Sequence, residues 1–200
     1  HDALPILHGN YECVNFLNLQ LRRDWQFLRP PVVAHVELVR DSDWARFAAL
    51  GVIANFEPFW AQQNAMLTGC IPHLGAERAD GMYAMRTALR AGVRLSFGSD
   101  WPVSSFVPLE GIQVAVTRAT LEAPEDRWTP EQALGASEAI SAYTSSVAAQ
   151  MGDSGAGALL PGNRADMVVL AADPLTCTAT DLSNCKVLAT FVGGQELYSA

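Results

Sequence analysis

The chain has 200 residues, of which 50% are hydrophobic and 17% charged, a composition typical of a globular protein and not of a disordered one. Thirteen Lys and Arg residues against 21 Asp and Glu give a net charge of −8, and no basic cluster occurs, so nucleic acid is not an expected partner. No apolar stretch reaches the ~18 residues of a membrane span and no signal peptide is recognisable, so no membrane association is expected.

Short apolar runs alternate with amphipathic segments along the first 120 residues. Each run is apolar almost throughout, which predicts strands buried on both faces of a parallel sheet. The predicted strands cover 3–7, 31–38, 51–58 and 93–100. The predicted helices cover 11–22, 41–51, 78–92 and 108–120. A strand followed by a helix, repeated about four times, predicts an α/β fold of right-handed βαβ units.

The character of the sequence changes after Pro124. Residues 129–152 predict one helix with Thr129 as its N-cap and Gly152 at its end. Beyond it, two β-type runs are punctuated by Pro-Gly and Gly-Gly turns, with no helix between them. We therefore place a domain boundary near 153–157, so that residues 1–153 form the α/β domain and 154–200 a small β portion.

The four cysteines indicate the cellular compartment, and the first residues indicate whether the chain is a whole protein. Cys13, Cys70, Cys177 and Cys185 lie far apart with no CxxC motif, which is typical of core residues in a reducing compartment and favours the cytoplasm. The chain begins at His1, and the residues that follow already have the character of a strand interior. We therefore interpret it as a piece of a longer protein.

Three polar side chains stand near the ends of predicted strands: His8, His35 and Asp100. The carboxyl ends of parallel strands are where α/β barrels place their active sites. Two imidazoles and one carboxylate suit a divalent metal of the zinc type, and Asp100 would also act as general base on metal-bound water. The alternatives are that His35 is a core histidine and that Asp100 caps the helix after it.

Several motifs in order resemble one family. The stretch "FGSDWPVSSFVPLEGIQVAVTR", with "RFAALGVIANFEPFWA" before it and "TPEQAL…PGNRADMVVLAADP" after it, resembles the C-terminal half of amidohydrolase-superfamily enzymes. The similarity is to amidohydrolase family 3, the branch that includes N-substituted formamide deformylases. It implies a metal-dependent (β/α)8 TIM barrel, of which this chain carries the second half (strands 5–8), plus a portion of a small β-sandwich. It also implies one or two divalent ions such as Zn²⁺ and hydrolysis of non-peptide C–N bonds in amides, formamides or cyclic amides.

The resemblance assigns roles to the three strand-end residues. It makes Asp100 the ligand and general base that closes strand 8, and His35 the ligand of strand 6. The stretch "HGNYEC" is nearest to the strand 5 motif and gives His8, although Tyr11 stands where the motif has glycine and Glu12 where it has aspartate. His1 is the rival; we prefer His8 because residues 3–7 supply a strand before it.

The family's first-strand His-x-His pair and strand 4 lysine are absent from this sequence. The expected partners are therefore the missing N-terminal half of the barrel and a small-molecule substrate, and the chain is expected to be inactive alone. A homo-oligomer is left open. The alternative function is a non-catalytic fragment or pseudoenzyme that acts only as a folding or interaction module.

Other residues are candidates for lesser roles. Trp60, Arg78 and Trp101 are predicted to bind substrate, with packing or a structural salt bridge as the alternatives. His73 and Glu77 lie with Arg78 in the long connection that follows the predicted strand 51–58, where they line the mouth of the site or brace the connection. The stretch "GDSGAG" at 152–157 resembles a serine-protease loop but follows a helix, so we interpret it as a link between domains, and Asp166 as a turn residue.

Overall fold

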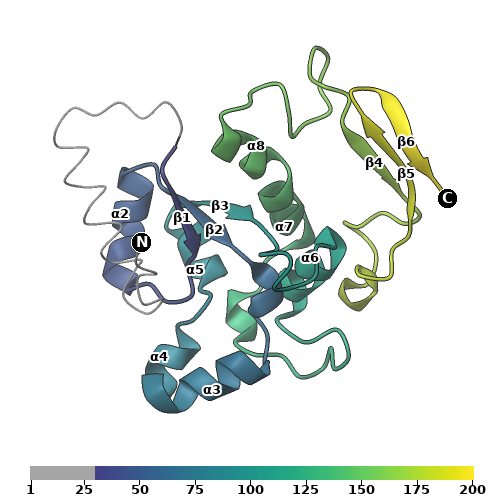
Figure 1. Ribbon diagram of the computed structural model, residues 1–200. Helices are drawn as coiled ribbons and strands as arrows, with labels where there is room; N and C mark the ends of the chain where they lie inside the picture. The colour runs from purple at the N-terminus through teal and green to yellow at the C-terminus, as the bar shows by residue number, and fades with distance from the viewer. Residues whose placement is uncertain (1–29) are drawn as a thin grey trace.

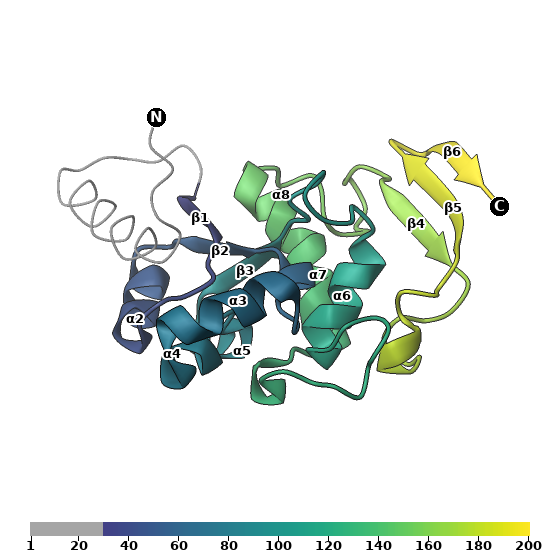
Figure 2. The same cartoon turned by 60° about the horizontal axis from the view of Figure 1, so that its bottom comes forward.

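The computed structural model describes residues 30–200; the predicted strand 3–7, the predicted helix 11–22, and His1, His8 and Cys13 lie outside the described residues. Residues 30–200 form two three-stranded sheets with helices around and between them (Figures 1 and 2). In chain order the elements are β1 (Val32–His35), α2 (Asp41–Ala49), β2 (Ile53–Phe56), the 3-10 turn η1 (Pro58–Trp60), α3 (Ala65–Leu74), α4 (Ala76–Asp80), α5 (Met85–Arg90), β3 (Arg94–Phe97), α6 (Pro108–Thr117), η2 (Pro130–Gln132), α7 (Ala136–Tyr143), α8 (Ser145–Met151), β4 (Met167–Leu170), η3 (Ala179–Asp181), β5 (Val187–Val192) and β6 (Gln195–Ser199).

The first sheet is parallel, with the strands in the order β1-β2-β3. Each strand falls inside one of the predicted apolar runs. Ala54 in the central strand lies opposite Val33 on one side and Leu95 on the other. Ile53, Ala54 and Phe56 are all buried, as expected for a strand covered on both faces.

Helix α2 confirms the segment predicted at 41–51. Asp41 and Asp43 occupy its first turn, where negative charge interacts favourably with the helix dipole. Trp44 and Phe47 are buried on its inner face. The helix ends before Gly51, which has the positive φ of 63° that glycine adopts without strain.

Residues 61–92 differ from the prediction. The connection expected around His73 is helix α3, capped by Asn64, whose Oδ1 accepts a hydrogen bond from the backbone N–H of Leu67 at 2.9 Å. The single helix predicted at 78–92 is two helices, α4 and α5. The break occurs because Met82 forms a β-bridge with Leu38 and the Tyr83 N–H donates to the carbonyl of Glu37, pairings that a continuous helix would not permit.

The helix predicted at 129–152 is also divided, into η2, α7 and α8. Thr129 does occupy the N-cap position, with Pro130 after it, but of the short η2, and its side chain does not cap: its φ is 44°, and its Oγ1 accepts a hydrogen bond from Nη2 of the buried Arg118 at 2.6 Å. Glu138 instead accepts from the backbone N–H of Gly135 at the start of α7. Thr144, with φ −118° and ψ −89°, separates α7 from α8. A tertiary contact with Arg118 therefore overrides the local capping pattern.

The second sheet is antiparallel, in the order β4-β5-β6, and lies within the predicted β-type runs. Helices α6 and α7 lie between the two sheets (Figures 1 and 2). The segment before β5 is attached to α6, because Gln113 Oε1 accepts from the Ser183 N–H at 2.9 Å and Leu182 is buried. The domain boundary near 153–157 stays a prediction.

The state of the cysteines and the absence of a membrane-spanning helix can be checked in the described residues. Cys70, Cys177 and Cys185 are free thiols. None of the helices in residues 30–200 combines the length and apolarity needed to cross a bilayer.

Candidate active site

The carboxyl edge of the parallel sheet carries the candidate site. His35 is the last residue of β1, and Asp100 follows the end of β3 by three residues. Glu57 comes directly after the last residue of β2. Because the strands run parallel, these ends meet at one edge of the sheet, the position where α/β barrels hold catalytic groups.

The backbone at this edge is strained. His35, Val36 and Asp100 have φ angles of 67°, 53° and 57°, in the left-handed region. Aspartate tolerates this conformation, but a β-branched valine rarely adopts it. Such residues cost on the order of 1–3 kcal/mol each and cluster at functional sites. The strain therefore supports a functional role for the strand ends.

The imidazole of His35 lies against two buried carboxylates. Its Nδ1 is 3.2 Å from Glu57 Oε2 and 3.9 Å from Glu37 Oε1. The His35 side chain is 44% exposed, whereas each glutamate side chain is only 7% exposed. Within residues 30–200, no donor is aligned well enough to form a hydrogen bond with Glu57 Oε2. The arrangement thus places one accessible nitrogen base over two desolvated acids.

Burial determines the electrostatics of these acids. Desolvation raises the pKa of Glu57 to about 7; the nearby His35 lowers it, and the negative charges of Asp100 and Glu37 raise it. Desolvation also raises the pKa of Glu37, with His35 lowering it and Asp100 raising it. Asp100 is therefore close enough to influence both glutamates. The two glutamates beside the imidazole, with Asp100 near enough to act on both, form a region in which a positive charge is favourable.

The donor set can be tested against a metal ion. Imidazole nitrogen and carboxylate oxygen are zinc donors, and His35 and Asp100 supply one of each. The buried, unpartnered oxygen of Glu57 is a further place where a cation is favourable. The chemistry of these residues therefore fits a divalent ion. In the described part of the chain, however, no group of three His, Cys, Asp or Glu side chains could hold a metal by itself, and the other predicted ligand, His8, lies outside it.

The predicted substrate-binding residues occupy different surroundings. Trp101 is 65% exposed, and its ring meets that of the exposed Phe106 edge-on, with the centroids 6.4 Å apart. Trp60, half-buried, ends the turn that follows Glu57. Arg78 is exposed, and its Nε donates to the Leu74 carbonyl at 2.7 Å, a contact within the α3–α4 segment. Trp60 and Trp101 thus follow two neighbouring strand ends, while Arg78 makes a local structural contact.

His73 and Glu77 are exposed on α3 and α4. Asp166 lies directly before β4 and not in a turn; its Oδ1 accepts from the Gly193 N–H at 2.7 Å and its Oδ2 from Arg164 Nε at 2.9 Å. Sequence reasoning missed Glu37 and Glu57. The signal was present, because each is a lone acid at the end of an apolar run, in "VVAHVEL" and "VIANFEP".

Helix α7 supports the end of β3. The Tyr143 hydroxyl donates to the Gly98 carbonyl at 3.3 Å, and its ring meets Phe97 edge-on at 5.3 Å between centroids. Gly98 begins the segment that leads to Asp100. The position of the candidate base therefore depends on packing between a helix and the strand end.

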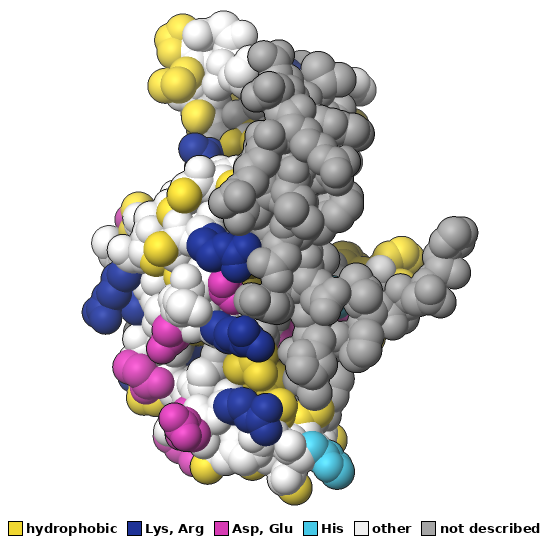
Figure 3. Space-filling view, turned by 90° about the vertical axis from the view of Figure 1, so that its left-hand side faces the viewer, with side chains coloured by type: hydrophobic (Ala, Val, Ile, Leu, Met, Phe, Trp, Pro, Cys, Tyr) yellow, Lys and Arg dark blue, Asp and Glu magenta, His cyan; other side chains and the backbone are white. Residues whose placement is uncertain are grey.

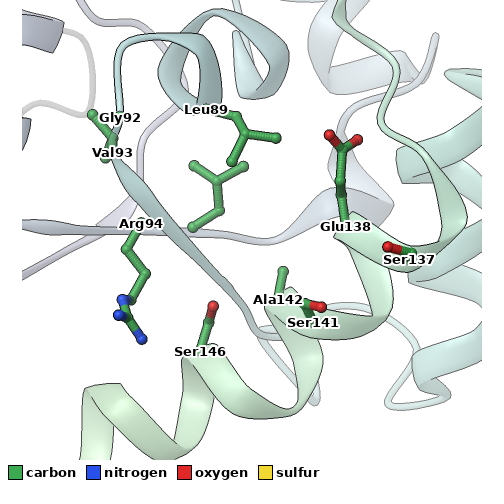
Figure 4. Close-up of a pocket in the computed structure, with 10 residues that line it drawn as sticks. Leu89, Gly92, Val93, Arg94, Ser137, Glu138, Ser141, Ala142 and Ser146 are labelled. Carbon is green, nitrogen blue, oxygen red and sulfur yellow. The ribbon is translucent and has the colours of Figure 1, made fainter.

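A cavity of about 420 Å³ lies at the other end of β3. Arg94, the first residue of that strand, lines it together with Glu138 and three serines of α7 and α8 (Figure 4). Because Asp100 follows the opposite end of the strand, this cavity is separate from the candidate site. On the face shown in Figure 3, acidic and basic side chains are interspersed over the described surface.

Comparison with known proteins identifies related chains. The sequence profile described as "Amidohydrolase family" matches residues 15–198, nearly the whole chain. Protein LONG AFTER FAR-RED 3 of Arabidopsis thaliana is 33% identical over 168 residues, which are 83% of this chain and 28% of that protein. The N-substituted formamide deformylase of Arthrobacter pascens is 37% identical over 115 residues, 56% of this chain and 21% of the relative.

A solved structure shows the same fold. The crystal structure of an uncharacterized metal-dependent hydrolase from Pyrococcus furiosus matches with a TM-score of 0.65 and 26% identity, covering 82% of this chain and 32% of that one. The chain thus spans less than a third of the length of these two curated relatives, 28% and 21%.

Proposed function

The chain belongs to the amidohydrolase family, and from this premise we propose that it is the C-terminal part of a metal-dependent hydrolase of non-peptide C–N bonds. The substrates would be amides, formamides or cyclic amides, in keeping with the named activity of the related deformylase. One observation carries the proposal: an imidazole and an aspartate at the carboxyl ends of parallel strands, in left-handed backbone, beside two buried carboxylates.

The proposed architecture follows from the same premise. Strands β1, β2 and β3 would be strands 6, 7 and 8 of a (β/α)8 TIM barrel, with residues 3–7 as strand 5. The sheet β4–β6 would be a portion of a small β-sandwich. The remaining strands would come from an N-terminal half, in agreement with the small share of each relative that this chain spans.

The proposed chemistry divides the roles among a few residues. His8 and His35 would hold a divalent ion such as Zn²⁺ together with Asp100. The ion would supply Lewis acidity towards the attacking water and the substrate carbonyl. Asp100 accepts a proton from the attacking water at its carboxylate and later delivers it to the leaving amine nitrogen. Trp60 and Trp101 form apolar walls for the substrate. The Nε of Arg78 is held by the Leu74 carbonyl, so its other guanidinium nitrogens would pair with a substrate carboxylate.

The proposal is tested in the full-length protein with Asp100→Asn, which keeps the side-chain volume and the tolerance for left-handed backbone but removes the base. We expect turnover of a formamide or amide substrate to fall about 10²–10⁴-fold with folding unchanged. Asp80→Asn, at an exposed position in α4, is the matched control and should retain activity. Elemental analysis should find zinc in the wild type and less in His35→Ala.

Near-wild-type turnover by Asp100→Asn would overturn the assignment of the base. A well-folded, metal-free and inactive full-length protein would instead favour the alternative, a non-catalytic folding or interaction module.

A further inference from the structure

We infer that Glu57 is a positioning residue for His35: its carboxylate accepts from Nδ1–H and so fixes the imidazole as the tautomer with its lone pair on Nε2. This inference deepens the proposed function and rests on it for the role of His35 as a metal ligand. It concerns a residue pair within the described chain, so it can be tested without turnover.

Strand register brings the pair together. His35 lies opposite Phe56 in the parallel pairing of β1 with β2, and Glu57 is the next residue after Phe56. The two side chains therefore leave neighbouring strands at the same level. Their closest atoms, Nδ1 and Oε2, are 3.2 Å apart, which leaves only a small reorientation of the imidazole to align the hydrogen bond.

Burial explains why Glu57 needs this partner. The side chain is only 7% exposed, and no residue in the 30–200 region is aligned to donate to its Oε2. An acceptor taken out of water without a donor is unfavourable. The Nδ1 of His35, at 3.2 Å, can satisfy it. Conversely, a carboxylate at Nδ1 favours the proton on that nitrogen, which leaves Nε2 as the basic one.

Glu37 provides an internal comparison. Its side chain is equally buried, and its Oε1 also faces Nδ1, but at 3.9 Å, beyond hydrogen-bond distance. Its backbone carbonyl is held by the Tyr83 N–H, and it belongs to the same strand segment as His35. Both glutamates supply negative charge, whereas only Glu57 is within reach of the ring N–H. A difference between their variants therefore separates positioning from general electrostatics.

The functional consequence follows from the chemistry of histidine ligands. A metal-binding imidazole commonly donates its other N–H to a carboxylate, which fixes the tautomer and raises its basicity. Removing such a partner lowers metal affinity about 10–100-fold. Glu57→Met, which keeps the length and removes the acceptor, should show this loss. Glu57→Gln, whose amide oxygen can still accept, should restore most of the affinity.

The experiment uses the full-length protein. Long-range ¹H–¹⁵N spectra of the metal-free form report the tautomer of His35. We expect the Nδ1–H form in the wild type, in Glu37→Gln and in Glu57→Gln, and a mixture of tautomers in Glu57→Met. Zinc competition with a chromogenic chelator then measures the affinity of each variant, with circular dichroism as the control for folding.

The possible results separate the positioning role of Glu57 from the proposed metal site. An Nε2–H tautomer in the wild type overturns the inference even if Glu57→Met does not fold. An unchanged tautomer in a folded Glu57→Met also overturns it, and so does an equal loss of affinity in Glu37→Gln. A wild type that binds no zinc but shows the Glu57-dependent tautomer contradicts the proposed metal site while the positioning contact stands.

Discussion

The two described sheets of this chain both contain apolar strand residues, but these residues are covered to different extents. In the parallel sheet β1–β3, the apolar side chains of the central strand are buried beneath the surrounding helices and turns. In the antiparallel sheet β4–β6, Val168, Leu188 and Leu197 are exposed. The difference teaches that an apolar run indicates a strand but does not reveal how much of that strand is covered. Covering depends on the helices that the chain supplies on each face.

The largest expected effect is on the free energy of unfolding, and it comes from comparing a buried with an exposed strand leucine. Leu95 in β3 is 4% exposed and Leu197 in β6 is 62% exposed. Leu95→Ala should lower the free energy of unfolding by about 2–5 kcal/mol, because it removes buried methyl groups and leaves a cavity. Leu197→Ala should change it by less than about 0.5 kcal/mol. Urea denaturation of the purified protein measures both, and equal losses would contradict the comparison.

A second prediction concerns how tightly the covering helices pack. A Cβ on Gly111 of α6 would collide with the Tyr143 hydroxyl, whereas nothing lies within 4 Å of a Cβ on Gly69 of α3. Gly111→Ala should destabilise the protein by about 1–3 kcal/mol through overpacking. Gly69→Ala should be neutral or stabilise it by about 0.5–1 kcal/mol, since alanine favours helix.

Thermal denaturation of both variants measures the difference. Adding Tyr143→Phe to Gly111→Ala should recover part of the loss, because it removes the atom that the new methyl group would meet. A double variant no more stable than Gly111→Ala alone would contradict this explanation.

The smallest expected effect is a pH dependence in the helices around the parallel sheet. Arg86 of α5 binds both carboxylate oxygens of Glu138 of α7 at 2.7 Å, and hydrogen bonding to Arg86 lowers the pKa of Glu138 in the folded protein. Because the folded value is below the unfolded one, the stabilisation is complete above the unfolded pKa and is lost as pH falls through the folded value. The pair is partly exposed, so its contribution is about 1 kcal/mol or less.

Glu138→Gln should therefore be less stable than the wild type at neutral pH and equal to it in acid. Glu122→Gln, at an exposed position, provides the control and should show no such convergence. A constant gap between wild type and Glu138→Gln from neutral pH into acid would mean that the ion pair does not cause the loss.

The sequence predicted the strands well because burial on both faces leaves a local signal. The runs at 31–38, 51–58 and 93–100 each contain one observed strand. The helix breaks at Tyr83 and Thr144 were not predicted. At Tyr83 a contact with Glu37, distant in sequence, determines the break, and at Thr129 the contact with Arg118 takes up the side chain expected to cap the helix. Local capping and periodicity carry no information about such partners.

The candidate site was predictable only in part. His35 and Asp100 lie at strand ends, as expected from the runs that precede them. Glu57 was missed because a single acid after an apolar run resembles an ordinary strand end. Only the register of β1 with β2 brings it within 3.2 Å of His35. The assignment of His8 and the roles of the site residues stay predictions.

The left-handed backbone at the strand ends also limits which residues can replace those now present. At Asp100, with φ 57°, glycine and asparagine fit the backbone, whereas valine or isoleucine would add conformational strain to any chemical effect. Val36, at φ 53°, already bears that penalty. Backbone geometry therefore restricts which substitutions are tolerated at this edge, in addition to the chemistry of the side chains. A substitution there can abolish function without altering any reactive group.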